Sequence, residues 1–221
     1  MAAAKPARMN ESAIRPQLLA RLRAGIGQLE PGVDEAACAQ LLDYIELLAR
    51  WNGTYNLTAV RALPDMVSHH LLDSLSIAGF VRGSNLADLG SGAGLPGIPL
   101  AIVAPDRDHV LIDSNGKKAR FLREAVRVLG LSNVRIEQSR VEQARGQFDT
   151  VTARAFASLP DMLRAGGHLL APDGVWLAMK GHVRPGETIE LPPGFCIRAI
   201  HPLRVPGLPA ERNVIEIRRE D

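Results

Sequence analysis

The sequence is poor in cysteine and aromatic residues and has no long apolar run. It contains two cysteines among 221 residues, and aromatic residues make up 4%. Cys38 and Cys196 lie far apart without metal-ligand spacing, so we expect two reduced thiols rather than a disulfide or zinc site. No apolar run reaches the ~18–20 residues that span a bilayer. Residues 1–23 lack the apolar core of a secretory signal, and Glu11 disfavours a mitochondrial transit peptide. We therefore expect a cytoplasmic protein.

Neither sign of charge dominates, because the formal net charge is +2. This balance alone requires no nucleic-acid partner, but the cations are unevenly distributed. Two basic clusters have the composition of phosphate-binding surfaces, and the alternative for each is a solvated helix face. The first contains Lys5, Arg8, Arg15, Arg21 and Arg23, and the second contains Lys117, Lys118, Arg120, Arg123 and Arg127.

Apolar periodicity predicts helices first and then alternating strands and helices. A helix over residues 34–51, capped by Asp34, precedes a loop over 52–56 and a helix from about residue 64 to 77. Strands are expected at 86–89, 109–113, 134–136, 148–154 and 175–179, with helices from about 96, over 115–129 and over 159–170, and a turn at 172–174. The last strands, 195–200 and 213–217, should form an antiparallel hairpin.

This alternation predicts an α/β fold with a mostly parallel, doubly wound, seven-stranded sheet and a helical N-terminal extension. We expect one domain, made of a basic arm or helix (1–32), a helical cap (33–82) and a Rossmann-like core (83–221). Such sheets bind ligands at the carboxyl ends of their strands.

A glycine-rich turn follows the first strand of the predicted sheet. The segment from Gly92 to Gly97 fits G-x-G-x-x-G, and Asp113 follows at about the ~20-residue spacing of a ribose-binding acid, so a nicotinamide oxidoreductase is one interpretation. Asp88, two residues before Gly90, favours a second interpretation, because its carboxylate suits the cationic donor S-adenosylmethionine better than a pyrophosphate. We also expect the residues after the turn to complete one sheet rather than form a separate substrate domain, which favours the methyl donor. A tight turn without a ligand is the third interpretation.

In the methyl-donor interpretation, the turn and the ends of the next strands form the cofactor site. Asp113 would bind the ribose hydroxyls, unless it caps the helix over 115–129 instead. Leu95 and the segment 139–142 would flank the adenine, although Glu142 could equally be a solvated carboxylate. Gly90, Gly92 and Asp88 complete the predicted set.

The segment Gly90–Leu100 resembles the signature of the ribosomal RNA small-subunit methyltransferase G family, also called glucose-inhibited division protein B. Further similar motifs lie at 51–52, 55–58, 70–74, 111–114, 121–123, 139–142, 154–159, 180–181 and 211–212. The resemblance covers about residue 35 to the C-terminus, with His69 where Arg is common and Asn213 where His is common. It implies a class I methyltransferase fold and N7 methylation of a guanine in 16S ribosomal RNA with S-adenosylmethionine. It also implies cofactor contacts at Gly90, Leu95, Val141, Glu142 and Arg154.

The implied chemistry agrees with motifs that the sequence lacks. Guanine N7 carries a lone pair and no proton, so no general base is required and none is assigned. The chain has neither the [DN]-PP-[FY] motif that grips an exocyclic amine nor a Pro-Cys pair for attack on a pyrimidine. Arg154, Lys180 and Arg123 are candidates to donate to guanine O6, and Arg154 could instead bind the cofactor carboxylate. The residues expected to contact RNA are Lys117, Lys118, Arg123, Lys180 and Arg212.

Two further residue groups have alternative interpretations. Phe156 and Trp176 could stack on a base, and core packing is favoured for Trp176. His69, His70 and Asp73 suggest a metal, but a hydrogen bond that orients their helix is favoured and no metal is predicted.

We therefore expect a monomeric methyltransferase that acts on 16S ribosomal RNA or the small ribosomal subunit, and not on DNA or a membrane. Its target guanine should be unpaired or flipped out, because the N7 edge is inaccessible in an A-form helix. An NAD(P)-binding oxidoreductase and a non-catalytic RNA-binding or ribosome-assembly factor remain the alternatives.

Overall fold

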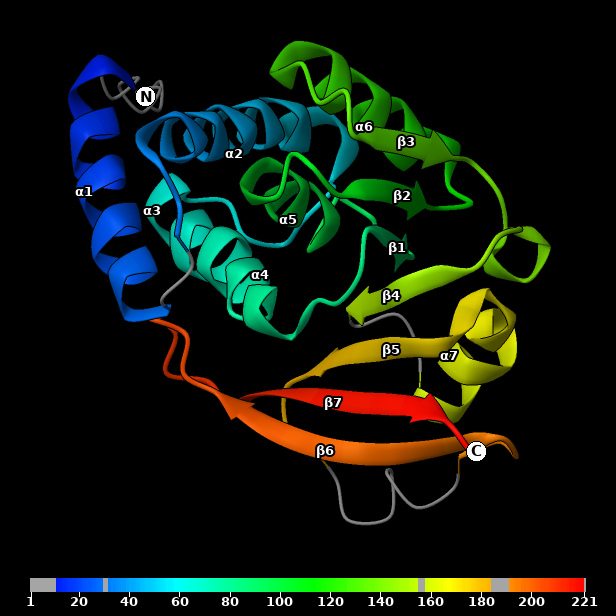
Figure 1. The fold of residues 1–221 in the computed structure, drawn as a ribbon. Helices are drawn as coiled ribbons and strands as arrows, with labels where there is room; N and C mark the ends of the chain where they lie inside the picture. The colour runs from blue at the N-terminus through cyan, green and yellow to red at the C-terminus, as the bar shows by residue number, and fades with distance from the viewer. Residues whose placement is uncertain (1–10, 30–31, 155–157, 184–190, 221) are drawn as a thin grey trace, which may run out of the picture.

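The computed structural model describes residues 11–29, 32–154, 158–183 and 191–220 (Figure 1). A seven-stranded sheet runs through it in the order β3-β2-β1-β4-β5-β7-β6. Strands β1 to β5 are parallel, whereas β7 is antiparallel to both β5 and β6. The predicted α/β sheet and its terminal hairpin are therefore confirmed. The strands are β1 (Asn85–Leu89), β2 (Asp108–Ile112), β3 (Val134–Glu137), β4 (Phe148–Arg154), β5 (Leu170–Lys180), β6 (Phe195–Leu203) and β7 (Arg212–Arg219).

The strand order reverses between β1 and β4, which creates the crevice where such sheets bind ligands. Leu89, the last residue of β1, lies opposite Ile112 of β2 and Ala153 of β4. The next residues along these strands, Asp113 and Arg154, therefore reach the same edge of the sheet as the glycine turn. This register brings together side chains from three distant parts of the sequence.

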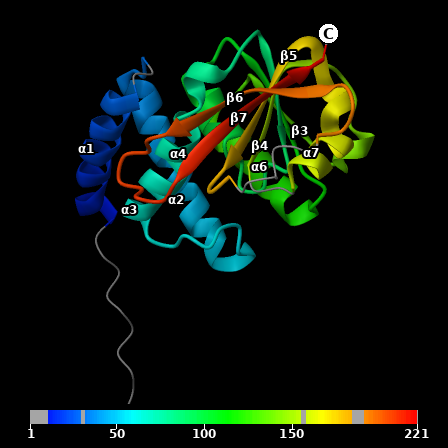
Figure 2. The same cartoon turned by 90° about the horizontal axis from the view of Figure 1, so that it is seen from below.

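Helices cover both faces of the sheet (Figures 1 and 2). Strand residues alternate between the faces, so Leu111 packs toward α2, α5 and α6, whereas Val110 and Ile112 pack with α7. Helix α1 packs on the helical layer through Leu18 and Leu22. The helices are α1 (Glu11–Leu29), α2 (Glu35–Tyr55), α3 (Leu63–Met66), α4 (Asp73–Leu75), α5 (Gly97–Val103), α6 (Gly116–Leu129) and α7 (Leu159–Gly166), with a π-helical segment at Val67–Leu72 and 3-10 turns at Ala78–Phe80, Val141–Gln143 and Gly167–Leu169.

Three local expectations differ from the structure. Helix α2 begins after its predicted cap, Asp34, but continues through the expected loop to Tyr55 and ends where Asn56 adopts φ 49°. The helix expected over 64–77 is interrupted by the π-helical segment. The turn expected at 172–174 lies inside β5, where the register with β4 shifts between Phe148 and Thr150. The shift in β5 is a local irregularity of the β4–β5 pair, whose residues stay paired on either side of it.

The described part of the chain contains no helix with the length and apolar character needed to cross a membrane. Both cysteines are free thiols, as expected. Trp176 has 0% of its surface exposed and packs in the core between the sheet and α7. The favoured interpretation of core packing is therefore confirmed, and the alternative that Trp176 stacks on a base is wrong. Phe156 lies outside the described residues.

A buried histidine on β2 makes stability depend on pH. His109 is 1% exposed, its Nδ1 lies 2.9 Å from the Arg107 carbonyl oxygen, and burial lowers its pKa to about 4 from 6.5. The unfolded chain therefore binds this proton more tightly, and stability is lost as pH falls from about 6.5 toward 4.

We expect His109→Asn to reduce this loss, because an amide nitrogen can replace the Nδ1 donor but does not titrate. Between pH 7 and 4.5 the unfolding free energy of the parent should fall by roughly 2–3 kcal/mol more than that of the variant. Urea denaturation at both pH values measures the difference. Equal losses in the two proteins would contradict the assignment.

Candidate functional site

The turn after β1 exposes bare backbone at the crevice. Gly92 adopts φ +61°, and a Cβ built there would meet no atom closer than 3.7 Å, so its face is open. Ser91 N donates to the Ile112 carbonyl oxygen at 3.1 Å, which ties the turn to β2. A ligand can therefore lie directly against the backbone of this turn.

Asp88 supports the turn from behind. It is 0% exposed, and its Oδ2 accepts a hydrogen bond from Gly97 N at 3.1 Å while its Oδ1 accepts from Thr152 Oγ1 at 3.1 Å. A Cβ on Gly97 would approach Asp88 Oδ2 to 2.8 Å, so this close contact requires glycine. Burial raises the pKa of Asp88 to about 6. Asp88 thus links β1, β4 and α5, and the geometry does not support the expected direct contact with a cationic ligand.

Asp113 braces the same turn from the end of β2. Its Oδ2 accepts from Gly92 N at 2.9 Å, and its Oδ1 accepts from Asn115 N at 2.8 Å. The side chain that caps α6 is that of Asn115, which accepts from Lys117 N at 2.9 Å, so the helix-cap alternative for Asp113 is wrong. Each carboxylate oxygen has a second lone pair, which leaves Asp113 able to accept hydrogen bonds from ribose hydroxyls.

The helical layer supports the turn and the crevice rim. The buried Tyr44 on α2 donates its hydroxyl to the Ala93 carbonyl oxygen at 2.7 Å. Asn52 Oδ1 accepts from Thr58 N at 2.9 Å, and His70 Nε2 lies 2.9 Å from Thr58 Oγ1. Burial and, secondarily, the charge of Arg154 lower the pKa of His70 to about 4, so this imidazole is neutral near pH 7. These contacts agree with the hydrogen-bonding interpretation of His70.

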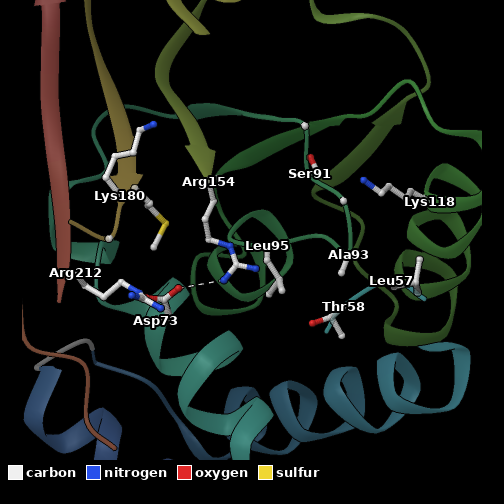
Figure 3. Close-up of a pocket in the computed structure, with 14 residues that line it drawn as sticks. Leu57, Thr58, Asp73, Ser91, Ala93, Leu95, Lys118, Arg154, Lys180 and Arg212 are labelled. Atoms are coloured by element: carbon white, nitrogen blue, oxygen red, sulfur yellow. Dashed lines mark hydrogen bonds and ion pairs between the residues drawn. The ribbon is translucent and has the colours of Figure 1, made fainter. Parts of the chain in front are cut away.

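Two cavities of about 410 and 430 Å³ meet at this edge of the sheet (Figure 3 shows the first). They share Gly90, Lys118 and Arg154, so they adjoin. All predicted cofactor residues except Asp88 line one or both of them. The first is lined by Leu57, Thr58, Asp73, Gly90, Ser91, Gly92, Ala93, Leu95, Lys118, Arg154, Met179, Lys180, Gly181 and Arg212, and the second by Gly90, Ile112, Asp113, Ser114, Asn115, Lys118, Ser139, Arg140, Val141, Glu142 and Arg154.

A buried carboxylate that we did not predict as part of the ligand site lies in the first cavity. Asp73 forms ion pairs with Arg154 at 3.1 Å and with Arg212 at 3.0 Å. Among the described residues no cluster of three or more His, Cys, Asp or Glu side chains could hold a metal ion. The motif at 70–74 and the spacing of His69, His70 and Asp73 were the sequence signals for Asp73, and neither revealed the two arginine partners.

The residues expected to contact RNA separate into two places. Lys118 lines both cavities, with Nζ 3.8 Å from Asp113 Oδ2, so it lies beside the predicted cofactor residues, and its contact with RNA stays a prediction. Lys180 and Arg212 line the first cavity. By contrast, Lys117 and Arg123 line an open groove beside α6.

The structure predicts different effects of two substitutions at Asp88. Asp88→Ala removes the acceptor of Gly97 N and should lower the unfolding free energy by about 1–3 kcal/mol. Asp88→Asn keeps an acceptor and cannot ionise. Because the folded-state pKa is raised from 3.8 to about 6, the parent loses stability as pH rises through this range and the Asn variant does not.

The stability of Asp88→Asn relative to the parent should therefore increase by roughly 2 kcal/mol from pH 4 to pH 7. Denaturant titrations at both values measure it. A constant difference between Asp88→Asn and the parent would show that Asp88 ionises normally.

Comparison with known proteins identifies the family. The family model described as rRNA small subunit methyltransferase G matches residues 37–215. A protein of that name from Stenotrophomonas maltophilia is 51% identical over 211 residues, which covers 95% of this chain and 99% of the relative. The protein of that name from Xanthomonas euvesicatoria is 48% identical over 213 residues, covering 96% of this chain and 100% of the relative.

A solved structure shares the fold. The magnesium protoporphyrin IX methyltransferase from Synechocystis, solved with bound SAH, has a TM-score of 0.55 and 17% identity, and the match covers 80% of this chain and 94% of that one. The glycine turn, the acid after β2 and the two joined cavities thus occur in a chain that belongs to the rRNA small subunit methyltransferase G family.

Proposed function

We propose that this chain transfers a methyl group from S-adenosylmethionine to N7 of a guanine in 16S ribosomal RNA. The observation that carries the proposal is the meeting of two cavities at Gly90, because one can hold the donor while the other admits the acceptor base. The family named above consists of methyltransferases, which favours this function over the oxidoreductase that G-x-G-x-x-G also permits.

The chemistry of the lining residues fits S-adenosylmethionine. Asp113 offers carboxylate lone pairs to the ribose hydroxyls at the end of β2. Val141 and Glu142 line the same cavity and would flank the adenine, with Leu95 on the adjoining side. Arg154 lies where the cavities join and would bind the amino-acid carboxylate. When bound, S-adenosylmethionine supplies a methyl group activated by a sulfonium.

The protein contributes to the reaction by positioning the acceptor. Guanine N7 needs no deprotonation, so no side chain has to remove a proton. Holding a nucleophile in line can supply ~7–11 kcal/mol of the barrier reduction. Lys180 and Arg212 line the first cavity and can orient the guanine edge, since O6 accepts hydrogen bonds beside N7.

RNA phosphates have a second place to bind, outside the cavities. The open groove beside α6 is lined by Lys117, Arg120 and Arg123 together with Tyr55. Asn115 lines both this groove and the second cavity, so the two adjoin. A strand held there would bring an unpaired or flipped guanine toward the methyl donor.

Methyl transfer from labelled S-adenosylmethionine to small ribosomal subunits that lack the modification tests the proposal. We expect label in N7-methylguanosine after digestion of the 16S ribosomal RNA. Label in another nucleoside, or none, would contradict it. RNA binding without turnover would favour a non-catalytic assembly factor, and saturable NADPH binding that S-adenosylhomocysteine does not displace would favour an oxidoreductase.

Adjacent lysines on α6 provide a matched pair of variants. Lys117→Ala should weaken RNA binding and reduce its salt dependence while leaving S-adenosylhomocysteine affinity unchanged, because Lys117 lines only the open groove. Lys118→Ala removes part of the wall of both cavities and should raise the Kd for S-adenosylhomocysteine about 2- to 5-fold. Calorimetry and salt-dependent RNA titrations separate the two effects. Identical behaviour of the variants in both assays would refute the assignment of Lys117 to the RNA groove and of Lys118 to the cofactor cavities.

A further inference from the structure

One buried carboxylate holds two arginines that line the first cavity. Asp73 is the first residue of α4, and its side chain is 3% exposed. Its Oδ2 accepts from Arg154 Nη1 at 3.1 Å, and its Oδ1 accepts from Arg212 Nε at 3.0 Å. Figure 3 shows the three side chains side by side, with Arg154 on β4 and Arg212 on β7. Asp73 therefore fixes two guanidinium groups that come from different strands.

These contacts leave particular N–H groups of the two arginines able to donate hydrogen bonds to a ligand. Arg154 Nη1 also donates to the His69 carbonyl oxygen at 3.2 Å, which uses both of its hydrogens. Arg212 Nη1 donates to the Glu211 carbonyl oxygen at 2.8 Å. Within the described ranges, Arg154 Nε and Nη2 and Arg212 Nη2 have no acceptor, and both side chains line the first cavity.

The two arginines line different parts of the site, although both pair with Asp73. Arg154 lines both cavities and shares this position with Gly90, which places it at the donor end. Arg212 lines only the first cavity, together with Lys180 and Gly181. This separation gives each guanidinium a different ligand group.

The charge of Asp73 also matters for the reaction. Methylation leaves a positive charge on the guanine ring, so two uncompensated guanidinium groups beside it would oppose the step. A buried anion between them offsets this repulsion and keeps both guanidinium groups oriented.

We propose that Asp73 is a positioning residue for methyl transfer. It fixes Arg154 on the carboxylate of S-adenosylmethionine and Arg212 on O6 of the acceptor guanine. The proposal rests on the function proposed above. O6 and N7 share one edge of guanine. A guanidinium that donates a hydrogen bond to O6 therefore also fixes the direction of the N7 lone pair. Arg212 is then the specificity-determining contact, and Asp73 acts through it.

The test compares Asp73→Asn, Arg212→Gln, the double variant and a control, by S-adenosylhomocysteine calorimetry and by methylation kinetics with small subunits. Asp73→Asn should raise the Kd for S-adenosylhomocysteine about 10-fold and lower kcat about 100-fold, because both guanidiniums lose their fixed positions. Arg212→Gln should leave that Kd unchanged and lower kcat about 10- to 100-fold. The double variant should have the kcat of Asp73→Asn, since the two residues act as a unit.

Asp43→Asn is the matched control, because Asp43 pairs with Arg15 at 2.8 Å on the exposed helical layer. It should retain parental kcat, KM and Kd. A purely structural role for Asp73 would lower the melting temperature of Asp73→Asn without changing kcat or Kd per folded molecule, and this result would overturn the proposal. If Asp73→Asn does not fold, Arg212→Gln decides alone, because full kcat in that variant would also overturn it.

The parental protein separates this proposal from the proposed function. Methyl transfer by the parent together with unchanged kinetics in Asp73→Asn refutes only the role of Asp73. Failure of the parent to methylate guanine N7 refutes the function itself.

Discussion

The site depends on the common end point of three parallel strands. Leu89, Ile112 and Ala153 lie opposite one another in the sheet, so the glycine turn, Asp113 and Arg154 emerge at one edge. Asp88 stabilises this arrangement from below through Gly97 and Thr152, and Tyr44 supports it from the helical layer. A shift of one residue in any of these strands would move the functional side chains to the opposite face.

The acids around the crevice have different roles because they are differently buried and partnered. Asp88 has no exposed surface and contacts only the protein's own donors, so its role is structural. Asp113 lines a cavity and retains lone pairs for a ligand. Asp73 pairs with two cations and thereby orients them. In the proposed function, one residue type thus shapes the turn, contacts the methyl donor and positions the cations.

The sequence predicted those features that depend on local patterns. Strand and helix periodicity, the glycine turn and the acid after β2 are encoded within a few residues, and their positions in the fold agree with the prediction. The roles that it missed depend on contacts between distant segments. Asp73 and Arg212 are separated by 139 positions, and no local pattern connects them. Lys117 and Lys118 look equivalent in sequence, but neighbouring residues on a helix point in different directions, and only Lys118 reaches the cavities. Helix α2 continues through the expected loop to Tyr55, whose ring stacks on that of Trp51 one turn earlier, with ring centroids 5.1 Å apart.

A crystal structure with S-adenosylhomocysteine tests the central claim most directly. We predict electron density in the second cavity, reaching to where it joins the first, with ribose hydroxyls within hydrogen-bonding distance of Asp113 and the amino-acid carboxylate facing Arg154. Density elsewhere on the protein, or a ribose that makes no contact with Asp113, would contradict it.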